Sequence, residues 1–255
     1  MKQRAVLLNL GALAFAAGIL ASWQILSDAR VISPIFFPPP SRALSELWAR
    51  FADGSAWTSI QATSTRMFVG WCCASLLGIV LGAAIGSSRL ARDYLEPTLE
   101  FVRPLPASAI IPIAILFLGL SNSMSVAVIA FGAIWPVLLS SVYGFGSINN
   151  RLQEISAVLG LTRREFLRKI AIPSAMPDVL AGVRVSLAIS LILAVVTEMQ
   201  ASLPGIGRDI FLAQRSFRSP DLYAGLILLG VIGFIVNFAL AAFEKHALRW
   251  RNPYS

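Results

Sequence analysis

The sequence predicts an all-α membrane protein: a single domain, residues 1–255, with six transmembrane helices. Three observations support this prediction, namely the composition, the lengths of the uncharged runs and the placement of Lys and Arg. Hydrophobic residues make up 56% of the chain and charged residues only 13%, whereas a typical soluble domain has about 25% charged residues. The mean hydropathy is +0.73. Because the chain has too few charges to cover itself with a water-facing surface, we expect a lipid bilayer around it.

Uncharged runs predict five of the spans directly. Ala5 to Ser27 is a run of 23 residues, and Met67 to Ser88 and Leu222 to Phe243 are runs of 22 each. Each run exceeds the ~20 residues that a helix needs to cross the hydrocarbon core. Pro104 to Asn150 holds 47 residues without a charge, which is enough for two spans, and Gly119 to Ser123 is the tight turn expected between them.

The remaining span is less regular, because only 13 residues separate Arg184 from Glu198. That stretch is too short to cross a bilayer. The predicted span therefore extends past both charges, with Arg184 snorkelling to the interface and Glu198 in the outer half of the membrane. The predicted spans are residues 5–27, 66–88, 97–119, 123–145, 179–203 and 222–243.

The placement of Lys and Arg predicts the orientation. With the N-terminus in the cytosol, the cytosolic side holds 14 of the 21 Lys and Arg residues and the outer side holds 7, as the positive-inside tendency requires. Both termini are then cytosolic, and so is the long polar loop 150–174. The net charge of +8 follows from this distribution. The basic residues are scattered at loop ends without interleaved aromatic residues, so no nucleic-acid partner is expected.

The loop 150–174 has the pattern of two short helices joined at a glycine. Asn150 is the expected N-cap of a first helix from Arg151 to Leu159, and Gly160 is a natural residue to end it. Thr162 and Glu165 then match a capping box at the start of a second helix.

The second helix is expected to run to about Ile170, before Pro173 interferes. Its apolar face holds Phe166, Leu167 and Ile170, and its basic face holds Arg163, Arg164, Arg168 and Lys169. Taken from the residues alone, this surface fits a groove on another protein and, equally, the surface of an anionic bilayer.

The spacing of the loop resembles the EAA loop of ABC-importer permeases. In that pattern Glu-Ala-Ala is followed by three residues, Gly, nine residues, Ile, one residue and Leu-Pro. Glu154, Gly160, Ile170 and Pro173 fall in register with it. Both alanines are replaced, by Ile155 and Ser156, and Ile172 stands where Leu is usual.

The resemblance implies that this loop docks on a separate ATPase. The residues that it implies for docking are Glu154, Ser156, Ala157, Gly160, Leu161, Thr162, Phe166, Ile170 and Pro173.

Further segments are similar to one branch of these permeases, the nitrate/sulfonate/taurine group. Phe36-Phe37-Pro38-Pro39-Pro40-Ser41 precedes an amphipathic segment, residues 41–53, that is expected to be periplasmic. Phe101 to Pro106 and Val196 to Met199 also look like segments of that group. The resemblance covers nearly the whole chain, from about Phe36 to Trp250.

Membership of that group would imply a type I ABC-importer-like fold, with the cytosolic coupling-helix loop between the fourth and fifth helices. It implies a multi-pass protein of the bacterial cytoplasmic membrane. The implied partners are a second copy of the chain, a cytosolic ATPase dimer and a periplasmic or lipid-anchored solute-binding protein. The substrate class stays open between a small anion, a sulfonate or taurine-like solute and a heterocyclic vitamin precursor.

The sequence predicts no catalytic site. It contains no Gly-x-x-x-x-Gly-Lys-Ser/Thr phosphate loop, so ATP and Mg²⁺ are expected on the partner ATPase and no cofactor on this chain. His246 is the only histidine, and its place in the basic C-terminal segment favours an interfacial residue over a catalyst.

Polar residues inside the spans are candidates for a translocation path or gate. They are Ser108, Ser140, Ser190, Thr197 and Glu198. Small hydroxyl residues more often join packed helices, whereas an ionisable residue in a span is a functional hypothesis. Glu198 is either such a residue or the partner of an outer-loop arginine, Arg208 or Arg66. The alternative function is an ion-coupled secondary transporter that uses Glu198.

Overall fold

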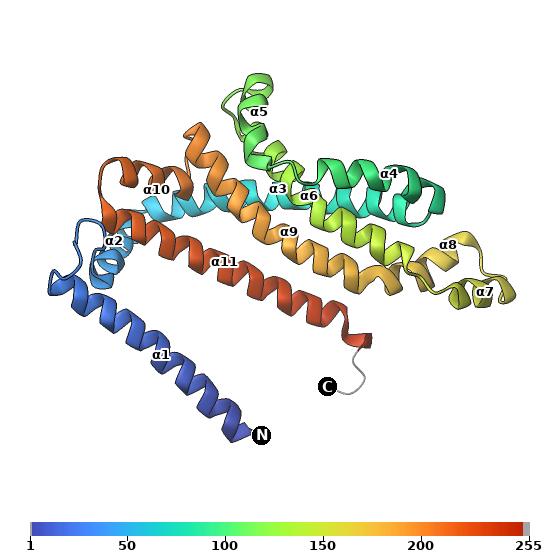
Figure 1. Ribbon diagram of the computed structural model, residues 1–255, viewed down its shortest axis with the longest axis horizontal. Coiled ribbons are helices and arrows are strands. Elements are labelled where there is room, and N and C mark those ends of the chain that lie inside the picture. Colours follow the sequence, from blue (N-terminus) through green and yellow to red (C-terminus); the bar gives the residue numbers. More distant parts are fainter. Residues whose placement is uncertain (1, 252–255) are drawn as a thin grey trace.

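The computed structural model describes residues 2–251, apart from the side chains at positions 2–10, 13, 96, 150, 153 and 251. Within that part of the chain every regular element is helical, as predicted (Figure 1). The elements are α1 (Lys2–Asp28), α2 (Pro40–Ala52), α3 (Ser55–Gly86), α4 (Arg89–Val102), η1 (Ala107–Ile110), α5 (Ile111–Leu118), α6 (Asn122–Gly146), α7 (Asn150–Val158), α8 (Arg163–Phe166), η2 (Leu167–Ala171), α9 (Ile172–Ala201), α10 (Ile206–Arg215), α11 (Ser219–Ala247) and η3 (Arg249–Arg251).

The centre of the molecule is a three-helix unit of α3, α6 and α9. Small residues on α3 recur every four positions, from Gly70 through Ala74 and Gly78 to Gly82, so they share one face and let α6 approach closely. A Cβ at Gly82 would stand 2.7 Å from the carbonyl oxygen of Leu138 on α6. The backbones are therefore nearly in contact along this seam.

Four helical stretches in the described part are long and apolar enough to cross a membrane: α3, α6, α11 and the continuous helix Arg163–Ala201. The pair formed by α4 and η1–α5 makes a fifth if it is one span. The predicted first span, 5–27, lies within α1, but the side chains before residue 11 lie outside the described ones. Its crossing of the membrane therefore stays a prediction.

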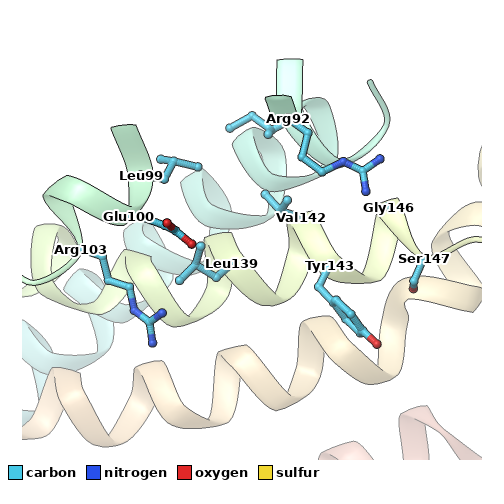
Figure 2. A pocket seen from close by; sticks show the side chains of 10 residues that line it. Arg92, Leu99, Glu100, Arg103, Leu139, Val142, Tyr143, Gly146 and Ser147 are labelled. Atoms are coloured by element: carbon cyan, nitrogen blue, oxygen red, sulfur yellow. The ribbon is translucent and has the colours of Figure 1, made fainter. Parts of the chain in front are cut away.

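The predicted third span, 97–119, is not one straight helix. The helix Arg89–Val102 and the stretch Ala107–Leu118 meet at 77°, with Pro104 and Pro106 in the break between them. Proline lacks the N–H that a continuous helix needs and crowds the preceding turn. A pocket of about 410 Å³ lies between α4 and α6 (Figure 2).

The predicted turn between the third and fourth spans is confirmed. The helix α5 ends at Leu118, Gly119 takes a positive φ of 66°, and the Ser121 hydroxyl caps α6 by accepting from the N–H of Met124. The segment predicted to be an amphipathic helix at 41–53 forms α2, Pro40–Ala52.

Two groups of short helices lie at opposite ends of the long axis. The short helices α2 and α10 gather at one end, and α7 and α8 project from the other (Figure 1). An ion pair between Arg184 of α9 and Glu244 near the end of α11 joins two helices that run antiparallel between these ends. Arg184 thus has a carboxylate partner that the sequence did not predict, and its position at the membrane interface stays a prediction.

Candidate functional site

The loop after α6 is held by a regular helix-ending motif. The N–H of Leu161 donates to the carbonyl of Ser156 (3.0 Å), and the N–H of Gly160 donates to that of Ala157 (3.1 Å). Gly160 has a φ of 63°, the left-handed conformation that glycine takes at no steric cost. These bonds satisfy the last carbonyls of α7 and turn the chain sharply, as the sequence predicted for Gly160.

The start of α7 differs from the prediction by one residue. Asn149, and not Asn150, is the N-cap, and its side chain accepts from the N–H of Arg151 (2.9 Å). The two adjacent asparagines both suit the position, so their residue type alone does not decide between them.

The predicted capping box at α8 is confirmed. The Thr162 hydroxyl accepts from the N–H of Glu165 (3.3 Å), and the Glu165 carboxylate accepts from the N–H of Thr162 (3.1 Å). The N–H and the hydroxyl of Thr162, which both donate to the Glu165 carboxylate, and the ammonium of Lys169 at 3.2 Å hold the pKa of this carboxyl below its ordinary value. The short helix therefore begins at a fixed place after the Gly160 turn.

The predicted end of the second helix near Ile170 is wrong. The helix widens into the π turn η2 and continues into α9 through Pro173. The N–H of Ile172 donates to the carbonyl of Leu167, five residues back. The wider turn makes room for the proline ring and needs no N–H from it, so α8 is a direct extension of α9.

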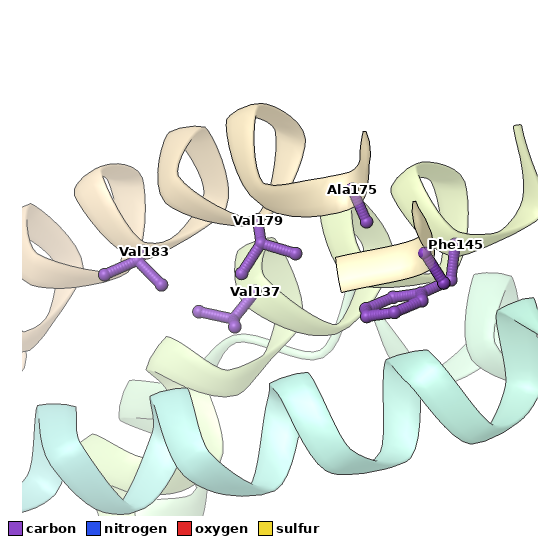
Figure 3. Close-up of a cluster of buried hydrophobic side chains, with 6 residues drawn as sticks. Val137, Phe145, Ala175, Val179 and Val183 are labelled. Atoms are coloured by element: carbon purple, nitrogen blue, oxygen red, sulfur yellow. The ribbon is translucent and has the colours of Figure 1, made fainter. Parts of the chain in front are cut away.

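The apolar face of the second helix is turned toward the bundle. Phe166 packs against a buried cluster where α6 and α9 meet. In Figure 3 the labelled side chains of this cluster, among them Val137, Phe145 and Val179, point toward one another from the two helices. Phe166 thus anchors the loop to the membrane domain.

The most exposed apolar side chains of the loop are on α7 and its end, while Leu167 and Ile172 are exposed to a lesser degree. Val158 is 88% exposed and Leu159 67% exposed, and Ile155 is also exposed. None of these three residues was among the predicted docking residues, because the sequence pattern placed the apolar docking face on the second loop helix. Of the other predicted loop residues, Glu154, Ala157, Gly160 and Thr162 are exposed and Leu161, Ile170 and Pro173 are partly buried, while Ser156 is buried.

The opposite end of the molecule holds a buried ion pair between Arg66 of α3 and Glu198 of α9. Their side chains are only 6% and 0% exposed. Glu198 also accepts hydrogen bonds from the Thr63 hydroxyl (3.0 Å) and from the N–H of Gly207 (2.9 Å). Among the two arginines that the sequence offered as partners, the structure places Arg66 on this carboxylate.

The turn between α9 and α10 closes over this ion pair. The guanidinium of Arg66 donates to the carbonyl of Pro204 and, through Nε, to the side-chain oxygen of Asn122 (2.8 Å). The N–H of Ile206 donates to Thr63 (3.0 Å). A Cβ at Gly205 would overlap the Glu198 carboxylate, so glycine is needed there. The network joins α3, α6, α9 and α10.

The five predicted path or gate residues do not gather at one place. Ser190 is buried and donates to the carbonyl of Ser186 (2.8 Å), and Thr197 is buried and shares a hydrogen bond of 2.6 Å with Ser125. Ser108 is exposed and Ser140 is partly exposed. The Thr197 bond joins α9 to α6, whereas the Ser190 bond stays within α9. Of the five residues, only Ser108 and Ser140 are accessible.

Comparisons with known proteins give the family. Residues 74–249 match the family described as the binding-protein-dependent transport system inner membrane component. The chain is 29% identical to the aliphatic sulfonates transport permease protein SsuC of Bacillus subtilis, over 93% of this chain and 86% of that protein. It is 28% identical to the taurine transport system permease protein TauC of Escherichia coli, over 97% of this chain and 91% of that protein.

The fold is also found among solved structures. One structure of the MetNI methionine ABC transporter, in an inward-facing conformation, aligns with a TM-score of 0.64 at 17% identity. The alignment covers 74% of this chain and 94% of that one. The chain therefore belongs to the binding-protein-dependent transport inner-membrane component family and is a non-catalytic permease subunit of a bacterial ABC importer.

Proposed function

We propose that this chain docks on a separate cytosolic ATPase through α7, the Gly160 turn and α8, and that it carries a small sulfonate across the membrane. The observation that carries the docking proposal is the apolar tip, which we define as Ile155, Val158 and Leu159. These side chains are exposed on a turn that backbone bonds hold rigid, and exposed apolar surface outside a bilayer marks a binding site.

The rigid continuation of α8 into α9 gives the docking a mechanical consequence. A push or pull on the tip reaches α8 across the hydrogen-bonded Gly160 turn. From α8 it passes directly into α9, since the helix Arg163–Ala201 is continuous. The far end of α9 carries Glu198 and the turn that closes over it. Movement of the ATPase would thus reach the outer end of the subunit along one helix.

The substrate proposal rests on the relatives. SsuC and TauC carry aliphatic sulfonates and taurine in their names, and taurine is itself a sulfonate. We expect the solute to be a small anion of that kind, delivered by a periplasmic or lipid-anchored binding protein. ATP and Mg²⁺ are expected on the ATPase dimer, and a second copy of this chain is expected to complete the path.

The proposed topology has six spans, cytosolic termini, a periplasmic α2 and the loop 150–174 in the cytosol. The path is proposed to pass the accessible Ser108 and Ser140. Ser190, Thr197 and Glu198 are buried within the subunit, so we assign them to the packing of α9, which Thr197 and Glu198 join to α6 and α3.

The ion-coupled alternative would need Glu198 to exchange a proton. Three donors already occupy its carboxylate, and the family assignment favours ATP as the energy source. We expect Glu198→Gln to keep ATP-dependent uptake in proteoliposomes and to gain no dependence on a pH gradient. Gradient-driven accumulation by the unmodified chain without ATP would exclude the importer proposal.

The docking proposal is tested with a charge placed on the tip. Val158→Glu adds a charge at an exposed side chain, so the subunit should insert and fold normally but lose co-purification with its ATPase. Ser174→Glu is the matched control, because Ser174 is exposed at the start of α9 and away from the tip. Equal co-purification of both variants with the ATPase would show that the tip is not the docking surface.

A further inference from the structure

A second pocket lies where the loop meets the membrane domain. It has a volume of about 350 Å³ and is lined by the end of α3, the start of α4, the end of α6 and α8. Arg89, Arg92 and Arg163 line it, and no acidic side chain is among its described lining residues. We call this pocket, defined by the three arginines, the basic pocket.

The three arginines of the basic pocket are not neutralised by an ion pair with any described side chain, although they lie close to one another. Ion pairs fix Arg50, Arg66, Arg184 and Arg218. Among the described side chains, no carboxylate pairs with Arg89, Arg92 or Arg163. Three cations that converge on one pocket without a counter-charge create a local positive potential that attracts an anion.

Arg92 is held in place for this role. Its guanidinium lies against Gly146, the last residue of α6, where a Cβ would stand 3.0 Å from Cζ of Arg92. A glycine at that point lets the guanidinium lie on the end of the helix, whose terminal carbonyls carry partial negative charge. Arg92 is half-buried, whereas Arg89 and Arg163 are exposed.

The basic pocket adjoins the pocket between α4 and α6, since Arg92 and Gly146 line both. Figure 2 shows Arg92 and Gly146 toward the Ser147 end of that pocket, with Leu139 and Val142 further along α6. An anionic head at the arginines would therefore lie beside the apolar side chains Leu139 and Val142, while Glu100 and Arg103 line the far part of the adjoining pocket.

We propose that the basic pocket binds a phosphate-bearing anion, either the headgroup of an acidic phospholipid or free phosphate. Guanidinium groups suit this ligand because their forked donors match tetrahedral oxyanions. The placement beside a lipid headgroup rests on the proposed topology, which puts this end of the bundle at the cytosolic leaflet, where acidic lipids attract basic segments. Bound there, the anion bridges α4 and α8 and stiffens the base of the docking loop.

The experiment measures lipid retention by the purified full-length chain in nanodiscs of phosphatidylcholine with a small fraction of phosphatidylglycerol. Loss of one arginine should weaken phosphatidylglycerol retention about fivefold, on the basis of about 1 kcal/mol per basic residue at an anionic surface. Arg92→Gln and Arg163→Gln are the test variants. Arg164→Gln removes the same charge one residue away, outside the lining, and should change retention by less than twofold. Arg92→Lys keeps the charge and should restore most of the retention.

A second arm distinguishes the source of the phosphate group. In pure phosphatidylcholine nanodiscs, inorganic phosphate is added and thermal protection is measured. If phosphate protects the unmodified chain but not Arg92→Gln or Arg163→Gln, and phosphatidylglycerol is not selectively retained, the ligand of the basic pocket is free phosphate. The proposal is overturned if neither ligand discriminates these variants from Arg164→Gln.

The same variants separate this proposal from the docking proposal. Retention is measured without the ATPase, so it does not depend on docking. ATPase co-purification is then measured in pure phosphatidylcholine. If Arg92→Gln and Arg163→Gln reduce co-purification but keep phosphate and phosphatidylglycerol binding, the arginines belong to the protein interface. That result would overturn the anion site.

Discussion

Gly160 has a φ of 63° and nothing within 4 Å of the place where a Cβ would stand, so the cost of a side chain there is conformational. Gly160→Val should destabilise the turn by about 1–2 kcal/mol, because L-residues resist the left-handed region and a β-branched one resists it most. Gly160→Asn should be tolerated, since asparagine visits that region readily. We expect ATPase binding to fall about tenfold for Val and less than threefold for Asn, measured by titration of purified subunits. Equal losses would mean that side-chain bulk at the tip, and not backbone conformation, limits docking.

Glu165 gives a residue-scale prediction on titration. Its folded pKa lies below the ordinary value of 4.5 because Thr162 and Lys169 bind the charged form. The capping contribution is therefore fully present above pH 4.5 and is lost as the pH falls through the lowered folded pKa. Thr162→Ala should raise the Glu165 pKa, as followed by carboxyl ¹³C NMR of the labelled chain. A native pKa at or above 4.5 would contradict the capping box.

Single residues were predictable where the signal is local. Gly160, Thr162 and Glu165 act within a few positions of the chain, so their roles follow from residue type and spacing. Glu198 and Arg66 are 132 positions apart. The sequence therefore left both Arg66 and Arg208 as candidate partners of Glu198. Thr63, Asn122 and the Gly207 N–H were not anticipated, since a hydroxyl, an amide and a backbone group carry no long-range signal.

At the scale of elements, the seam between α3 and α6 depends on glycine. A Cβ at Gly82 would meet backbone of α6, which cannot move aside cheaply. Gly82→Ala should lower the stability of the folded protein by about 1–3 kcal/mol through overpacking. Gly230→Ala is the control, because no atom lies within 4 Å of its Cβ position on α11 and alanine favours helix. Thermal unfolding of the purified variants should separate them; a Gly82→Ala protein as stable as Gly230→Ala would show that the seam is looser than described.

The joint between α9 and α10 depends on the Arg66–Glu198 pair. Removing one partner leaves a buried charge and should cost about 3–5 kcal/mol. Arg66→Met/Glu198→Met together should cost less than Arg66→Met alone, since no charge is then left unpaired. Thermal midpoints should therefore rank wild type first, the double variant second and the single variants last. A double variant less stable than both single variants would argue that Thr63 and Gly207, and not the charge pair, hold the joint.

Element boundaries were less predictable where proline is involved. Proline was expected to end the second loop helix, but η2 lets the helix pass through Pro173 by widening one turn. In the third span, predicted as one helix over residues 97–119, Pro104 and Pro106 lie in the break between α4 and η1. The prolines account for the break in the helix, but the 77° angle places α5 beside α6 and α9, a packing arrangement that no local pattern encodes.

At the scale of the whole molecule, the fold class followed from composition and from run lengths, since both sum over many residues. The proposed docking surface was only partly predictable from the sequence. The sequence placed an apolar and a basic face on α8, and the structure uses the apolar face, through Phe166, to anchor the loop. Which face of a short amphipathic helix meets its own protein is decided by tertiary packing, and only coordinates show it.

The central claim is that the tip of α7 meets the ATPase on one side of the membrane while α10 lies on the other. The most direct test is photo-crosslinking in intact cells that express the full transporter. One photoreactive residue replaces Val158, and in a separate strain one replaces Ser216, which is exposed just after α10. The account predicts a crosslink to the ATPase from position 158 and none from position 216. A crosslink to the ATPase from position 216 with none from position 158 would contradict it.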